Sequence, residues 1–215
     1  MSDRYVPAAG RAGLTPLYDA VNAVAMRQGR WRPRLVERAV GSGAPARILD
    51  LGCGTGEMAL AIGRACGEVT LIGVDGDPEV LDRAGVKARA QDIELELHEA
   101  LADHIPLADE DLDCVVSTLL FHHLGPAAKR AALAEARRVL RPGGRLLVCD
   151  VGRASDPLMR AAFFAVQLLD GFANTRENIR GELPEIISQA GFAPVTVFGR
   201  SRTGAGTLDL IEALR

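Results

Sequence analysis

The chain has 215 residues, a formal net charge of −3 and 48% hydrophobic residues, which suits one sizeable core in a globular domain. Its acidic balance argues against nucleic acid as a partner, because nucleic-acid binders usually show a basic surface. No apolar run is long enough to cross a bilayer, and the four cysteines lack metal-site or Cys-x-x-Cys spacing, so we expect a cytoplasmic protein without a transmembrane segment or a metal.

The first 44 residues are expected to form a helical cover. Residues 14–40 predict one or two helices, and a loop with glycine and proline follows over 41–45. Tyr18 lies in this segment, and a basic cluster surrounds Trp31: Arg27, Arg30, Arg32, Arg34 and Arg38. A solvated helix face is the simpler interpretation of this cluster, and attraction to an anionic substrate or a lipid surface is the alternative.

Residues 48–57, with the sequence ILDLGCGTGE, contain the strongest functional signal. The pattern predicts a buried strand over 46–51, a tight turn, and a helix over 57–65. Glycines at alternate positions let a ligand approach the exposed backbone N–H groups. The spacing differs from the dinucleotide fingerprint Gly-x-Gly-x-x-Gly, and Asp50 beside the turn disfavours a pyrophosphate and suits a positively charged group such as an amino-acid ammonium.

A second acidic residue ends the next predicted strand, at 69–74. Asp75 stands 19 residues after Gly56, where a carboxylate can accept both hydroxyl groups of a ribose. The simpler interpretation, an N-terminal cap for a helix over 78–90, suits Asp77 better. On the segment from Asp50 to Gly56 and on Asp75, the chain resembles the class I S-adenosylmethionine-dependent methyltransferases.

The resemblance implies S-adenosylmethionine as cofactor, S-adenosylhomocysteine as product, and Asp50 facing the methionine ammonium. The cofactor would contact residues at the ends of four strands: Asp50, Gly52, Cys53, Gly54, Gly56, Asp75, Gly76, Leu101, Ala102 and Ser117. Leu101 replaces the acidic residue that binds the adenine amino group in the family. The adenine would then be held by backbone groups of Leu101 and Ala102 and by apolar contact, or Asp103 could substitute for the missing carboxylate from another angle.

Further strands are predicted at 93–97, 112–117 and 145–151, with a helix over 127–140, and residues 195–198 and 207–213 predict an antiparallel hairpin. The resemblance implies an α/β fold: a doubly wound, mostly parallel, seven-stranded Rossmann-like sheet with this hairpin at one edge. We expect one methyltransferase domain over 1–215. It divides into a helical cover at 1–44, a cofactor-binding core at 45–151, a substrate-lid insertion at 152–182, and a C-terminal helix and hairpin at 183–215.

Two adjacent histidines, His122 and His123, follow the strand at 112–117. Methyl transfer from a sulfonium is an in-line displacement that mainly needs positioning and exclusion of water. An acceptor hydroxyl or activated ring carbon would need a base, and we expect His122 first and His123 second. Residues 117–124 and 137–144 resemble the ubiquinone/menaquinone C-methyltransferase branch.

A strongly apolar helix is predicted over 158–172. We interpret residues 14–22 and 157–176 as a mobile lid over a pocket lined by Tyr18, Phe163 and Phe164, although a buried core helix fits the composition equally well. The expected function is C- or O-methylation of a small, largely apolar acceptor, and a homodimer stays open as the oligomeric state. A non-catalytic S-adenosylmethionine-binding regulator is the alternative. A nicotinamide-dependent oxidoreductase is disfavoured, because neither its turn spacing nor a Tyr/Lys catalytic set is evident.

Overall fold

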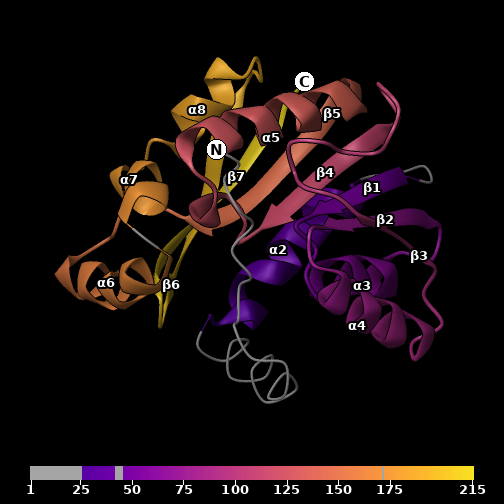
Figure 1. Cartoon of the computed structure of the whole chain (residues 1–215), viewed down its shortest axis with the longest axis horizontal. Helices are drawn as coiled ribbons and strands as arrows, with labels where there is room; N and C mark the ends of the chain where they lie inside the picture. The colour runs from indigo at the N-terminus through magenta and orange to yellow at the C-terminus, as the bar shows by residue number, and fades with distance from the viewer. Residues whose placement is uncertain (1–25, 42–45, 171) are drawn as a thin grey trace.

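A computed structural model describes residues 26–41, 46–170 and 172–215 of the chain. These residues are built around one seven-stranded sheet (Figure 1). In chain order the strands are β1 (Ala46–Leu51), β2 (Val69–Asp75), β3 (Leu95–Glu99), β4 (Leu112–Thr118), β5 (Leu140–Val151), β6 (Val195–Thr203) and β7 (Gly206–Leu214). Their order in the sheet is β3-β2-β1-β4-β5-β7-β6. The first five strands pair in parallel, and β7 pairs antiparallel with both β5 and β6, which confirms the predicted fold class.

Helices cover both faces of the sheet. In chain order they are α2 (Gln28–Val40), α3 (Glu57–Ala65), α4 (Pro78–Arg89), the short 3₁₀ helix η1 (Phe121–His123), α5 (Pro126–Val139), α6 (Pro157–Asp170), α7 (Phe172–Arg180) and α8 (Leu183–Gln189). Apolar residues of α2, α3 and α6 share one core cluster with alternate strand residues, and those of α5 and α8 share the cluster on the opposite face. This is the layering that buried parallel strands require. None of the helices described is long and apolar enough to span a membrane.

Several elements differ from their predicted bounds, and the strand predicted at 195–198 extends to Thr203. The strand predicted at 93–97 begins two residues later, because Asp92 adopts φ 53° and prolongs the turn after α4. The strand predicted at 145–151 begins at Leu140, because Leu140 pairs with Leu112 of β4 and because Gly143 and Gly144 exchange backbone hydrogen bonds with Arg215. The apolar helix predicted over 158–172 ends at Asp170, and a separate helix, α7, follows it.

The carboxyl ends of the parallel strands meet at one edge of the sheet, where open α/β folds bind ligands. The glycine turn leaves β1 at this edge, Asp75 ends β2, η1 follows β4, and Asp150 lies at the end of β5. The next two helices, α6 and α7, follow β5 directly (Figure 1). The fold therefore brings most of the predicted site residues to one place.

Candidate active site

The glycine turn after β1 depends on a left-handed backbone. Gly52, Gly54 and Gly56 have φ values of 71°, 52° and 78°, which side chains with a Cβ rarely adopt. A Cβ on Gly52 would lie 2.9 Å from Leu120 Cδ1, whereas one on Gly54 would meet no heavy atom within 4 Å. The N–H groups of Gly52 and Cys53 both donate to the carbonyl oxygen of Val74. The turn is therefore fixed to β2, and it leaves open space beside Gly54.

Asp50 lies beneath this turn and is only 1% exposed. Its Oδ2 accepts a hydrogen bond from the backbone N–H of Ala59, at 3.1 Å. Burial raises the pKa of Asp50 to about 7, although the bond from Ala59 acts in the opposite direction. Its Oδ1 is buried and accepts no hydrogen bond from the residues that the structure describes. A buried acceptor without a donor is costly, so this oxygen fits a cationic donor such as an ammonium.

Asp75 connects the glycine turn to the end of β2. Its Oδ2 accepts from the N–H of Gly54 at 2.8 Å, and its Oδ1 accepts from Asp77 N at 3.1 Å. Burial is the main cause that raises its pKa. Asp77 caps α4 by accepting from Glu79 N, as the sequence predicted. Each carboxylate oxygen has two lone pairs, so Asp75 can hold the turn and also accept a ribose hydroxyl.

The other predicted cofactor residues divide into buried and accessible ones. Ser117 is fully buried, and its hydroxyl donates to the carbonyl oxygen of Leu51 at 3.0 Å. Cys53 is buried against β2, and burial raises the pKa of its thiol. Leu101 is 48% exposed, and Gly76 and Ala102 are partly exposed. The side chains of Ser117 and Cys53 therefore pack inside the fold, whereas Leu101, Gly76 and Ala102 are accessible from outside.

His122 forms a buried pair with Asp150. The imidazole is 6% exposed, and its Nδ1 lies 2.8 Å from Asp150 Oδ1. Asp150 also accepts hydrogen bonds from the backbone N–H groups of Phe121 and Val151 and from the Asn178 side chain. Burial opposes ionisation of Asp150, but His122, the backbone N–H of Val151 and His123 hold its pKa below the usual value. The carboxylate therefore stays ionised and fixes the orientation of the ring.

Asp150 was not predicted as a site residue from the sequence, although a signal was present. An acidic residue at the end of a parallel strand marked Asp50 and Asp75, and Asp150 stands in the same position on β5. His123 is partly exposed, its ring centroid lies 4.0 Å from that of His122, and its carbonyl oxygen accepts from the Asn174 side chain. Both histidines are therefore held at the ligand edge.

Two predicted lid residues on α6, Phe163 and Phe164, lie in different environments. Phe163 is buried in the core cluster beside β7, while Phe164 is 48% exposed and meets Phe172 edge to face at 6.0 Å. The buried Lys129 of α5 donates to the carbonyl oxygen of Asn174, which fastens α7 to the site. Tyr18 and the predicted cover over residues 14–22 lie outside the described residues.

Comparison with known proteins gives consistent matches. A family model described as a methyltransferase domain matches residues 48–144. A demethylmenaquinone methyltransferase of Thermus thermophilus is 37% identical over 139 residues, which are 64% of this chain and 62% of that protein. A ubiquinone/menaquinone biosynthesis C-methyltransferase of Syntrophotalea carbinolica is 33% identical over 70% of this chain and 63% of its own length.

The matches thus span less than two thirds of either relative. Among solved structures, the YcgJ protein of Bacillus subtilis has a TM-score of 0.72 at 20% identity. That match covers 87% of this chain and 98% of the YcgJ chain. At this identity it supports the fold alone.

Proposed function

We propose that the chain is a class I S-adenosylmethionine-dependent methyltransferase similar to the ubiquinone/menaquinone C-methyltransferase branch, and that it methylates a small, largely apolar acceptor at carbon or oxygen. The observation that supports this most strongly is the buried, carboxylate-held His122 at the same sheet edge as the open glycine turn. The names of the relatives point to a quinone-type ring as acceptor, which fits a largely apolar pocket. The four cysteines are free, which fits the cytoplasmic location that we infer.

The cofactor would lie along the carboxyl ends of β1, β2 and β3. Asp50 Oδ1 would accept from the methionine ammonium, and the backbone at Gly52 and Gly54 would support the methionyl chain. Asp75 would accept from the ribose, and Leu101 would cover the adenine. When bound, S-adenosylmethionine supplies a methyl group on a positively charged sulfur, which is a good leaving group.

His122 would act as the general base. Asp150 accepts a hydrogen bond from a proton on Nδ1, which leaves the lone pair of the ring on Nε2. Nε2 would take the proton from an acceptor hydroxyl or ring carbon, and Asp150 would stabilise the imidazolium that results. His123 is the second candidate for this role. Because the reaction is a displacement, the remaining work of the site is to align the acceptor and exclude water.

Replacing Asp75 with alanine should weaken S-adenosylhomocysteine binding by about 1.5–3 kcal/mol, because a charge-assisted hydrogen bond to the ribose is lost. Calorimetric titration of the folded variant measures this. Asp82→Ala, an exposed change on α4, is the matched control and should bind normally. Equal affinity of Asp75→Ala and wild type would remove Asp75 from the site. Tighter binding of NAD at the same site would favour an oxidoreductase, and binding without turnover of S-adenosylmethionine would favour a regulator.

We also propose that α6 and α7 close over the acceptor. Amide hydrogen exchange should be fast in residues 157–176 of the free protein and slower once S-adenosylhomocysteine and an acceptor analogue bind, because lids belong to the less stable parts of a fold. Exchange in α5 serves as the internal control and should change little. Uniformly slow exchange in 157–176 without ligand would favour the core-helix interpretation instead.

A further inference from the structure

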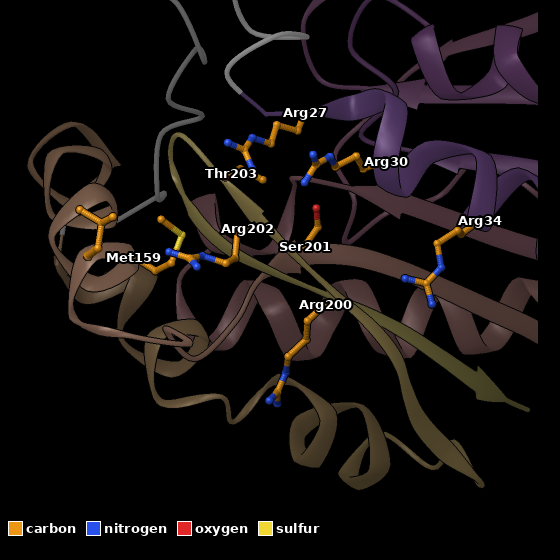
Figure 2. A pocket seen from close by; sticks show the side chains of 9 residues that line it. Arg27, Arg30, Arg34, Met159, Arg200, Ser201, Arg202 and Thr203 are labelled. Carbon is orange, nitrogen blue, oxygen red and sulfur yellow. The ribbon is translucent and has the colours of Figure 1, made fainter.

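A cavity of about 510 Å³ lies between the N-terminal end of α2, the end of β6 and the start of α6 (Figure 2). Five arginines line this arginine pocket: Arg27, Arg30, Arg34, Arg200 and Arg202. None of the described residues that line it is acidic. The pocket is thus strongly basic, although the net charge of the whole chain is −3. Five guanidinium groups this close together repel one another unless a counter-charge is present.

Neighbouring groups compensate only part of this charge. Arg200 pairs with Asp209 at 2.8 Å, and Arg202 pairs with Asp156 at 3.2 Å. Arg34 donates to the carbonyl oxygen of Phe198, which is not an ionic partner. Within the part of the chain that the structure describes, Arg27 and Arg30 form no ion pair. Two carboxylates against five guanidinium groups leave an excess of three positive charges.

Three of the five guanidinium groups, those of Arg27, Arg30 and Arg34, have no ionic partner among the described residues, and those of Arg27 and Arg30 point in the same direction. Figure 2 shows Arg27 and Arg30 extending from α2 toward the end of β6, where the hydroxyl of Ser201 points back toward Arg30. The N-terminal end of α2 lies at the same cavity, has no acidic residue in its first turn, and has no side-chain cap. Arg27, just before the helix, adopts φ 48°. Guanidinium and hydroxyl donors therefore lie at the same cavity as the positive end of a helix dipole. Together these groups favour binding of an anion.

We propose that the arginine pocket binds a phosphoryl group. Guanidinium groups match the oxygens of a phosphate with paired hydrogen bonds, and a local excess of three charges suits a phosphate or diphosphate better than a single carboxylate. Leu158 and Met159 of α6 form an apolar wall of the same cavity, so the ligand would also have an apolar part beside its phosphoryl group.

The position of the pocket suggests what carries the phosphoryl group. Because β6 and β5 both pair antiparallel with β7, the end of β6 lies at the carboxyl edge of β5, where the proposed acceptor site lies. The phosphoryl group would belong either to a soluble acceptor or to the headgroup of a phospholipid in which an apolar acceptor dissolves. Only this last step rests on the proposed function; the anion site itself does not.

Calorimetric titration of the full chain with inorganic pyrophosphate tests the soluble source. Arg30→Gln should weaken binding by about tenfold or more, because it removes a charge-assisted pair of hydrogen bonds. Arg27→Gln combined with Arg30→Gln should weaken it further. Arg30→Lys keeps the positive charge but not the paired hydrogen bonds, so its affinity should fall between those of the wild type and Arg30→Gln. Arg89→Gln, an exposed change of the same charge on α4, is the matched control. Affinity for S-adenosylhomocysteine should stay the same in every variant.

Flotation with phosphatidylcholine vesicles containing phosphatidylglycerol tests the headgroup source. Arginine-dependent binding to these vesicles without pyrophosphate binding identifies a headgroup, and the reverse result identifies a soluble phosphoryl ligand. Absence of both, or binding that the double variant leaves unchanged, overturns the proposal. If S-adenosylhomocysteine still binds in that case, the proposed function survives alone. If pyrophosphate binds and S-adenosylhomocysteine does not, the anion site survives and the proposed function fails.

Discussion

Replacing His122 with alanine should lower kcat for methyl transfer by about 10²–10⁴-fold, which is the usual contribution of a general base. The Michaelis constant for S-adenosylmethionine should change little, because in the proposed mechanism the imidazole acts on the acceptor, and the proposed cofactor contacts lie at the ends of β1, β2 and β3. Single-turnover measurement with an identified acceptor separates the chemical step from product release. His104→Ala, a change at an exposed histidine, should retain full activity.

Asp150→Asn provides the second test of the same pair. The amide can still contact Nδ1, but it removes the charge that stabilises the imidazolium and can favour the wrong tautomer. We expect a fall in kcat similar to that of His122→Ala, and little further loss when both changes are combined, because the two residues act as one unit. Full activity of His122→Ala would eliminate the base at this position, and a large loss in His123→Ala alone would transfer the role to His123.

The sequence predicted best where one local pattern determined the structure. The strand at 46–51 and the helix over 57–65 have the predicted bounds, because the glycine turn between them requires a left-handed backbone at three positions. The start of β5 could not be predicted in this way. It depends on pairing of Leu140 with Leu112 and of Gly143 and Gly144 with Arg215. These contacts join residues far apart in the sequence, so no local pattern contains them.

The candidate site shows the same division between local and distant information. The glycine turn and Asp75 were readable because each stands at the end of its own strand. The pair of His122 and Asp150 needed the adjacency of β4 and β5, and the arginine pocket needed β6 to lie beside the start of α2. The basic residues of α2 alone favoured a solvated helix face. Because Arg200 and Arg202 line the same cavity, the structure instead favours the proposed anion site.

Binding of S-adenosylhomocysteine should weaken as the pH falls below about 7. Burial raises the pKa of Asp50 to about 7, and a bound ammonium would stabilise the ionised carboxylate and lower that pKa. Above pH 7 the free protein already has Asp50 ionised, so affinity should reach a plateau. Below pH 7 binding must release a proton from Asp50, so affinity should fall by up to about tenfold for each pH unit.

Titration calorimetry at pH 8, 7, 6 and 5.5 would test this linkage, together with measurement of the protons released in buffers of different ionisation enthalpy. Asp50→Asn cannot ionise, so it should bind weakly and with a flat pH profile. Asp75→Ala should also bind weakly but keep the slope, because Asp50 still titrates in that variant. A flat profile in the wild type, or the same slope in Asp50→Asn, would show that the ammonium does not contact Asp50. The unpaired Oδ1 would then need another donor, and the methionyl end of the cofactor would have to lie elsewhere along the glycine turn.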